Sequence, residues 1–370
     1  MKLILPLMFW LVGLFLMWNV QEVGRRKNSS ENATETLPRI SVIIPARNEA
    51  QKIEKLLRSL EEQTFKPYEV IVVDDESSDA TAAVAQRFNT KVITGKKAED
   101  GWLGKPWACW QGANHAGGDT FLFLDADTWL TPHGLNNIMI RYLNRGGLVT
   151  VQPYHVTVKI YEQLSVFFNI IVLAGLNAFT PLGDKLKPSG GFGPCVMCSR
   201  ENYFSMGGHT AAKNNVLEDI TLAKAFIAKG YRVSCYSGKG SISFRMYPDG
   251  LQSLIEGWGK GFAEGSDSIR KSFLLLTILW ITGCFEVFIK LVRSLSFSET
   301  HMVWVLFALY GLYVLQIRWM LQKIGRFQIW TALLFPIPLV FFTLLMVWSI
   351  VQKHVLRKVV WKDRVIRFDR

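Results

Sequence analysis

The stretch Phe121-Leu-Phe-Leu-Asp125-Ala-Asp127 places two carboxylates directly after a run of apolar residues. The apolar run is typical of a buried strand in a parallel sheet, and ligands of such sheets bind just beyond the carboxyl ends of the strands. On an extended chain, Asp125 and Asp127 share one face while Ala126 points to the other. Two such carboxylates suit Mg2+, which completes its shell with phosphate oxygens and water. The alternative is a strand followed by an ordinary acidic turn, because a lone Asp-x-Asp pattern is common.

Strands and helices alternate on both sides of this stretch. The short β-branched or apolar runs predict strands at residues 40–44, 69–73, 91–94, 147–152, 232–236 and 241–245. Helical spacing predicts helices at residues 50–63, around 82–84, at 106–116, at 159–179 and at 216–230. This order indicates βαβ units and an α/β fold, with residues 39–130 as a nucleotide-binding half. Neither a Gly-x-Gly-x-x-Gly nor a Walker phosphate loop occurs, so a nucleotide would be held by carboxylates and a metal ion.

Membrane-length apolar runs lie near both ends of the 370-residue chain, which is 49% hydrophobic with a mean hydropathy of +0.18. Residues 3–20 form the first run, and Arg25, Arg26 and Lys27 follow it. By the positive-inside rule this predicts an anchor with a cytoplasmic downstream domain. A signal peptide is the alternative, but no clear small-x-small cleavage site precedes Asn19.

Three further apolar runs cover residues 273–292, 302–321 and 329–351. If all three span the bilayer, the basic tail at residues 353–370 emerges outside, against the positive-inside rule. Pro336 and Pro338 favour a re-entrant hairpin that returns the tail to the cytoplasm. We therefore expect a multi-pass protein of the cell membrane with a cytoplasmic catalytic domain.

The formal net charge of +12 does not indicate nucleic-acid binding, because the basic residues gather beside apolar segments and would face anionic lipid headgroups. The five cysteines predict free thiols. Cys195 and Cys198 form a CxxC pair, but no second pair accompanies it, so a zinc site is not favoured.

Two helices have open interpretations. Residues 249–262 are amphipathic and precede the membrane runs, which predicts a helix lying in the membrane interface, with a core-packing helix as the alternative. Residues 160–179 either help to admit a hydrophobic acceptor from the bilayer or form a buried core helix. Asp219 lies in the first turn of its predicted helix, where the helix dipole favours an ionised carboxylate. Glu218 and Asp219 are also common first-turn acids, and spacing alone does not distinguish a catalytic role.

Five motifs in this order resemble family 2 glycosyltransferases with the GT-A fold. They are Val42-Ile-Ile-Pro-Ala-Arg-Asn48-Glu49, Asp74-Asp75-x-Ser-x-Asp79, Gly104-Lys105-Pro-x-Ala, Asp125-x-Asp127 and Glu218-Asp219. Further segments more particularly resemble membrane-bound carotenoid glycosyltransferases: the terminal anchor, Val151-Gln-Pro-Tyr-His155, Phe244-Arg-Met-Tyr247, the helix from Gln252 to Trp258 and Trp361-Lys-x-Arg364. That resemblance implies an inverting hexosyltransferase with a UDP-glucose donor, a carotenoid carboxylate acceptor and a Mg2+ or Mn2+ cofactor.

The resemblance also implies roles for individual residues. Asp219 would be the catalytic base, and Asp125 with Asp127 would hold the metal ion against the diphosphate. The donor would be bound by Pro45, Asn48, Glu49, Asp75, Lys105 and Asp125. The acceptor or interface residues would be Glu218, Gln252 and Trp258. One departure is that related membrane synthases carry Gln-x-x-Arg-Trp on the interface helix, whereas Gly257 precedes Trp258 here. The arginine that would contact the pyrophosphate from this helix is therefore absent, and Arg245 or Lys260 would have to replace it.

The predicted domain organisation has six parts. They are an anchor at residues 1–21, a linker at 22–38, a GT-A catalytic domain at 39–248, an interface helix at 249–270, membrane segments at 271–351 and a basic tail at 352–370. Expected partners are a UDP-sugar, a hydrophobic acceptor and membrane lipids. The open alternatives are another lipid acceptor, such as diacylglycerol, a hopanoid or a polyprenyl lipid, a non-catalytic membrane scaffold, or a lipid transporter.

Overall fold

The computed structural model describes residues 4–24, 37–213, 215, 217–265, 270–296, 300–353, 358–361 and 364–367. The chain forms two compact units, each described below by itself. One unit combines residues 21–155 with 190–245, and the other combines residues 1–20 with 156–189 and 246–370. Arg25, Arg26 and Lys27, which carry the prediction of a cytoplasmic domain, lie outside the described residues.

The first unit is built on a seven-stranded sheet with the order β3-β2-β1-β4-β8-β6-β9. Its strands are β1 (Ile40–Ala46), β2 (Glu69–Asp74), β3 (Lys91–Thr94), β4 (Thr120–Leu124), β6 (Leu148–Gln152), β8 (Cys195–Ser199) and β9 (Val233–Ser237). The strands β1 to β4 are parallel, whereas β8 is antiparallel to both of its neighbours. The α/β fold is confirmed, but the sheet is mixed because the chain returns through β8.

Helices connect these strands and complete the unit. They are α2 (Ala50–Glu61), α3 (Thr81–Ala85), α4 (Gly104–His115), α5 (Gly134–Arg145), α7 (Arg200–Ser205), the 3-10 helix η3 (Gly208–Ala212) and α8 (Glu218–Ala228). The sequence analysis missed α5, α7 and η3. A small second sheet places β10 (Ile242–Phe244) between β5 (Thr128–Leu130) and β7 (Tyr154–Val156).

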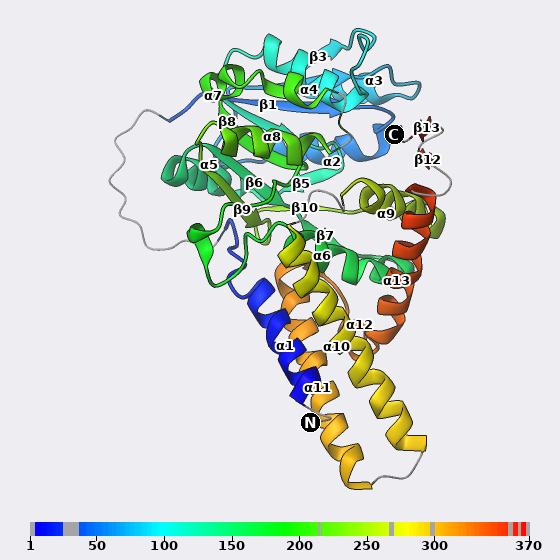
Figure 1. Ribbon diagram of the computed structural model, residues 1–370. Coiled ribbons are helices and arrows are strands. Elements are labelled where there is room, and N and C mark those ends of the chain that lie inside the picture. Colours follow the sequence, from blue (N-terminus) through cyan, green and yellow to red (C-terminus); the bar gives the residue numbers. More distant parts are fainter. Residues whose placement is uncertain are drawn as a thin grey trace. The chain divides into compact units, whose positions relative to one another are not determined.

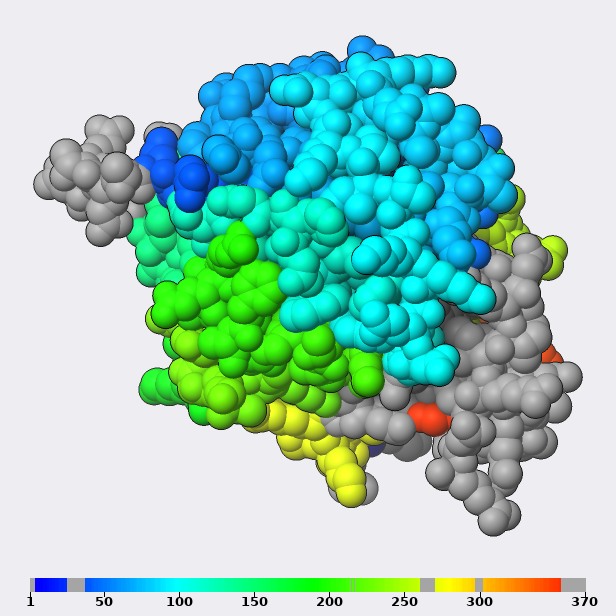
Figure 2. All heavy atoms as spheres, turned by 90° about the horizontal axis from the view of Figure 1, so that it is seen from above, coloured from blue at the N-terminus to red at the C-terminus, as the bar shows by residue number. Residues whose placement is uncertain are grey.

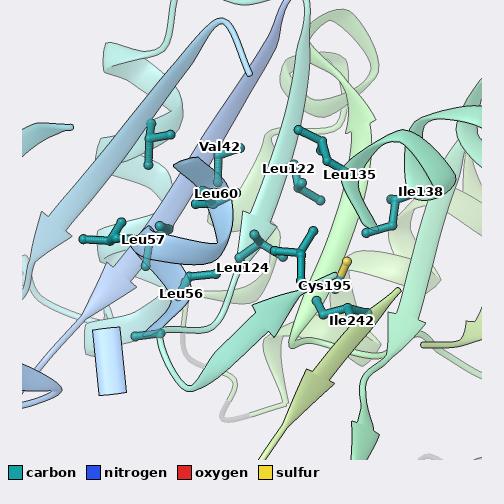
Figure 3. Packing of buried hydrophobic residues seen from close by; sticks show 14 of the residues in the cluster. Val42, Leu56, Leu57, Leu60, Leu122, Leu124, Leu135, Ile138, Cys195 and Ile242 are labelled. Carbon is teal, nitrogen blue, oxygen red and sulfur yellow. The ribbon is translucent and has the colours of Figure 1, made fainter. Parts of the chain in front are cut away.

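The core of this unit fills the space between α2, α5 and the sheet. Leu56, Leu57 and Leu60 on α2 pack with Val42 of β1 and Leu124 of β4, all buried (Figure 3). The helical spacing of the leucines supplies one apolar stripe, and the fully buried strand matches it. This packing holds the ends of β1 and β4 in fixed positions next to each other.

The second unit is mainly helical. It contains α1 (Ile4–Met17), η1 (Ile160–Ser165), α6 (Val166–Gly175), η2 (Gly183–Lys185), α9 (Leu251–Gly265), α10 (Lys271–Ser296), α11 (Thr300–Ile324), α12 (Ile329–Leu333) and α13 (Pro336–Val351). Three short strands, β11 (Gly325–Arg326), β12 (Lys358–Trp361) and β13 (Arg364–Arg367), complete it. Within this unit, α1, α10 and α11 run side by side (Figure 1).

Within the described residues, α10 and α11 are the two helices long and apolar enough to cross a membrane. The predicted N-terminal anchor is a shorter helix than expected, because α1 has 14 residues and a span needs about 20. The apolar run at 329–351 is not one helix: it is divided into α12 and α13. The residues at the division include Phe335, followed by Pro336 at the first position of α13, as is usual for a proline.

Buried polar contacts join α1 to its two neighbours. The Gln316 side chain donates from Nε2 to the Trp10 carbonyl oxygen at 2.6 Å and accepts at Oε1 from Trp280 Nε1 at 2.8 Å. Tyr313 Oη donates to the Pro6 carbonyl oxygen at 2.7 Å. An apolar environment makes an unpaired polar group costly, so these bonds specify how α1 packs.

The predicted helix at 159–179 is shorter than expected. It begins as the 3-10 helix η1, continues as α6 and ends at Gly175. Nearly every side chain of α6 is buried, including Phe167 and Phe168. This burial matches the core-helix interpretation of the segment.

An aromatic contact joins α9 to the segment that precedes it. Tyr247 has a φ of 54°, which is uncommon for a bulky residue, and Tyr161 Oη donates to its carbonyl oxygen at 2.8 Å. The Tyr247 ring lies directly on Gly257, where a Cβ atom would come within 2.1 Å of the ring atom Cε1. Position 257 therefore has no space for a side chain.

We predict that Gly257→Ala lowers the free energy of unfolding by about 1–3 kcal/mol, the usual cost of overpacking, although alanine favours helices. Thermal unfolding of the purified protein in detergent measures this. Gly311→Ala on α11 is the matched control, because no atom lies within 4 Å of its Cβ position. A Gly257→Ala variant as stable as the parent would contradict the packing described here.

Candidate active site

The two aspartates lie in a tight turn after β4. Thr128 donates from its backbone N–H, at 3.1 Å, and from Oγ1, at 2.8 Å, to the Asp125 carbonyl oxygen. Ala126 is buried, and the two carboxylates are partly exposed. A hydrogen-bonded turn therefore stands where the sequence analysis expected an extended strand, and a common metal-binding face of the two carboxylates stays a prediction.

Lys105 connects the first aspartate to α8. Its Nζ lies 2.7 Å from Asp125 Oδ1 and 2.8 Å from Glu218 Oε1. Lys105 is in the first turn of α4, Asp125 follows β4, and Glu218 begins α8. Three elements that are distant in sequence are thus joined by one ammonium group.

These residues line a small pocket in the first unit. Its lining includes Pro45 at the end of β1, Lys105, Asp125, Glu218 and Asp219. Gly193 gives Asp219 its space, because a Cβ atom at position 193 would lie 3.0 Å from Asp219 Oδ2. The structure therefore brings together the predicted catalytic base and three of the predicted donor-binding residues.

The charges in this pocket are unevenly balanced. Burial raises the pKa of Glu218, but the charge and hydrogen bond of Lys105 together with a backbone hydrogen bond outweigh this, and the net pKa is lowered. Burial and then the Glu218 charge raise the pKa of Asp219 to about 7. Burial and then the Asp125 charge raise the pKa of Asp127 to about 7. One ammonium group therefore faces two carboxylates, and the raised pKa values of Asp127 and Asp219 show that the pocket keeps an excess of negative charge.

Asp75 follows β2 in the sequence, and its carboxylate lies next to the N-terminus of α4 in the fold. A Cβ atom on Gly104 would come within 2.4 Å of Asp75 Oδ2, so only glycine leaves room for this carboxylate. Arg47 Nη1 lies 3.6 Å from the same oxygen. The helix N-terminus and the guanidinium both favour negative charge at this position.

Asn48 and Glu49 belong to a loop that is closely hydrogen-bonded to the loop after β2. Asn48 has a φ of 52°, and its Oδ1 accepts from the Ser78 backbone N–H at 2.8 Å. Glu49 Oε2 lies 3.2 Å from Lys52 Nζ. These contacts shape the loop, and contact of either residue with a donor stays a prediction.

Gln252 and Trp258 are on α9 of the helical unit. Gln252 is exposed and donates to Glu256 Oε1 at 2.9 Å. Trp258 is buried, stacks on Phe168 with ring centroids 4.9 Å apart, and donates from Nε1 to Ser165 Oγ at 3.2 Å. Trp258 therefore packs as a core residue of this unit. The arginine missing at position 257 is explained by the Tyr247 ring, which occupies its place.

The two aspartates fit a divalent cation only as a partial ligand set. Among the described residues, no group of three or more His, Cys, Asp or Glu side chains is arranged to hold a metal ion. Two carboxylates with excess negative charge are nevertheless sufficient for Mg2+ when phosphate oxygens and water supply the other ligands. Cys195 and Cys198 lie on β8 as buried free thiols.

Two residues that sequence reasoning missed also belong to the pocket region. His209 of η3 lines the pocket, and Tyr203 of α7 contacts it. A single histidine within a Gly-Gly-His sequence carries no signal of such a role. In the space-filling view, the cyan part of the chain adjoins the green part on the surface (Figure 2). One hydrogen bond links the segments before α4 and after η3: the Leu103 backbone N–H donates to the Lys213 carbonyl oxygen at 2.9 Å.

The sequence matches the family model described as Glycosyl transferase family 2 over residues 41–204. A 4,4'-diaponeurosporenoate glycosyltransferase of Staphylococcus aureus (strain USA300) is 35% identical over 329 residues, which are 88% of this chain and 87% of the relative. The chain belongs to glycosyltransferase family 2. The protein of the same name from Staphylococcus haemolyticus (strain JCSC1435) is 36% identical to this glycosyltransferase over 359 residues, 96% of this chain and 95% of the relative.

The solved structures confirm the fold of this glycosyltransferase. The mannosyltransferase PcManGT from Pyrobaculum calidifontis, in complex with GDP-Man and Mn2+, superposes with a TM-score of 0.52 and 18% identity, over 94% of this chain and 96% of that chain. The sequence-based assignment to the GT-A fold is therefore correct.

The raised carboxyl pKa values predict how the stability of the metal-free protein depends on pH. Between about pH 4, where an unfolded aspartate titrates, and pH 7, the folded state holds more protons on Asp127 and Asp219 than the unfolded state does. Stability therefore falls as pH rises through this window.

We expect a lower Tm at pH 8 than at pH 5.5 when a chelator is present. In Asp219→Asn the difference in Tm between the two pH values should be smaller. The exposed Asp119→Asn is the control, and an unchanged pH slope in Asp219→Asn would refute the assignment.

Proposed function

We propose that this glycosyltransferase transfers glucose from UDP-glucose to the carboxylate of 4,4'-diaponeurosporenoate, with inversion at the anomeric carbon. The observation that carries the proposal is the identity of 35% and 36% to enzymes of that name along most of the chain. The pocket that joins Lys105, Asp125, Glu218 and Asp219 supports it, because charged groups of this kind suit a nucleotide sugar.

Asp125 and Asp127 would hold Mg2+ or Mn2+, and the diphosphate of the donor would supply further ligands. The Mn2+ bound to PcManGT, which shares this fold, supports a divalent ion. The ion would act as a Lewis acid that neutralises negative charge on the departing UDP. Because the protein supplies at most two carboxylates, binding of the ion and of the nucleotide would be mutually dependent.

The reaction would form a bond from an acceptor oxygen to the anomeric carbon and break the bond from that carbon to the β-phosphate oxygen. The electron pair of the broken bond leaves with UDP. Asp219 lies in the pocket where it would remove the proton of a hydroxyl acceptor. A carboxylic acid acceptor is already ionised near neutral pH, so proton removal contributes little. Asp219 would then mainly position the sugar or the acceptor.

We further propose that α10 and α11 span the bilayer. The helices contain 26 and 25 residues, which exceeds the 20 or so that a span requires. Two crossings return the chain to its starting side, so the basic tail and the GT-A unit would both be cytoplasmic. The division of the last apolar run into α12 and α13 supports this topology, because a third crossing would place the tail outside.

The decisive assay uses purified protein in liposomes with UDP-[14C]glucose. We expect transfer to 4,4'-diaponeurosporenoate, loss of transfer with chelator, and at least a hundredfold loss in Asp127→Ala, a size typical for lost electrostatic stabilisation. Asp119→Asn should retain full activity. Transfer to diacylglycerol, a hopanoid or a polyprenyl lipid in preference to the carotenoid would replace the proposed acceptor. Undiminished transfer by metal-stripped Asp127→Ala would refute the metal-assisted mechanism. No transfer to any acceptor by the parent protein would favour a non-catalytic scaffold.

The acceptor chemistry predicts a specific effect of Asp219→Asn. With the carotenoid acid, the variant should lose at least tenfold less activity than with the corresponding primary alcohol, because only the alcohol needs a base. The kcat ratio of variant to parent, measured with both acceptors at pH 7.5, gives the comparison. Equal and complete loss with both acceptors would contradict the proposed division of roles.

A further inference from the structure

A buried histidine forms one wall of the active-site pocket. His209 is 4% exposed and lines the pocket together with Lys105, Glu218 and Asp219. Gly207 and Gly208, with φ of 76° and 53°, form the turn that brings it there. Phe123 packs against the His209 ring with centroids 5.0 Å apart.

Tyr203 contacts His209 at its backbone N–H and at the ring nitrogen Nδ1, and we assign the hydrogen between Oη and Nδ1 to the tyrosine. The His209 backbone N–H lies 3.3 Å from Tyr203 Oη and donates to it. The Tyr203 hydroxyl hydrogen is then directed to His209 Nδ1, 2.8 Å away. Because Nδ1 accepts this hydrogen bond, the neutral ring carries its own hydrogen on Nε2. Burial lowers the pKa of His209 to about 4, so the ring is neutral at physiological pH.

The charged groups that face this ring are Glu218 and Lys105. Lys105 holds the Glu218 carboxylate in place from 2.8 Å. His209 and the fixed Glu218 carboxylate line the same pocket, and with Nδ1 assigned as the acceptor of the Tyr203 hydroxyl the N–H donor of the neutral ring is on Nε2. A hydroxyl group, which both accepts and donates, complements this pair. A diphosphate would be repelled by Glu218, and a hydrocarbon chain would leave both groups unpaired.

We propose that His209 Nε2–H and the Glu218 carboxylate bind hydroxyl groups of the transferred hexose, and that His209 is a specificity-determining residue for the sugar of the donor. This inference rests on the proposed function, because it requires a nucleotide-sugar donor. Tyr203 acts through His209 and is a positioning residue: without its hydroxyl the ring is free to place its hydrogen on Nδ1.

The test compares the binding of UDP and of UDP-glucose to the full-length protein by isothermal titration calorimetry with Mn2+. In His209→Leu we expect the affinity for UDP to stay within twofold and the affinity for UDP-glucose to fall about tenfold, the order expected for one lost hydrogen bond. Tyr203→Phe keeps the packing of the ring and should weaken UDP-glucose alone, about threefold. His115→Leu, an exposed histidine on α4, should change neither affinity.

Deoxy analogues of UDP-glucose identify the hydroxyl. The analogue that lacks the recognised hydroxyl should bind the parent more weakly than UDP-glucose does, and should bind His209→Leu as well as UDP-glucose does. Equal weakening of UDP and UDP-glucose in both variants, or no change for UDP-glucose in either, would overturn the proposal. A parent protein that binds UDP-glucose with this His209 dependence but fails to glycosylate the carotenoid would refute only the proposed acceptor. A parent that binds no UDP-sugar would refute both.

Discussion

One ammonium group holds the active site together. Lys105 connects Asp125, at the end of a central strand, to Glu218, at the start of α8, with both distances below 3 Å. The three residues come from positions 105, 125 and 218, so the bridge closes loops that are long in sequence. Without it, two partly buried carboxylates would face each other, and the beginning of α8 would lose its electrostatic contact with the sheet.

The remaining charges explain why the site suits its proposed ligands. Lys105 faces both Asp125 and Glu218, and the raised pKa values of Asp127 and Asp219 show that negative charge is left over. A divalent ion would remove this excess near Asp127, and the diphosphate would complete its coordination. Binding of the proposed ligands would therefore stabilise the fold, since each carboxylate is costly until a cation or a proton neutralises it.

The helical unit is held together mainly by packing of apolar helices, whereas the candidate site in the first unit depends on charged side chains. Its apolar helices are held by a few buried polar contacts, such as those of Gln316 with Trp10 and Trp280, and by close approaches at glycines. Gly257 shows how local packing changes a family motif. The Tyr247 ring covers the position where related synthases place an arginine, so the helix that carries Trp258 is secured by aromatic packing in this protein. Any contact with the diphosphate must come from other residues.

The sequence by itself determined the strands that precede Asp75 and Asp125, the membrane-length runs at α10 and α11, and the family. These features depend on periodicity and on short motifs, which are local properties of the chain. It overestimated the helix at 159–179 and the anchor, because apolar composition does not show where a helix ends. Only the tertiary structure decided that Lys105 joins Asp125 to Glu218, that Tyr203 Oη lies 2.8 Å from His209 Nδ1, and that Tyr247 excludes a side chain at position 257. Each of these depends on contacts between separate elements, and such contacts leave no periodic signal in the sequence.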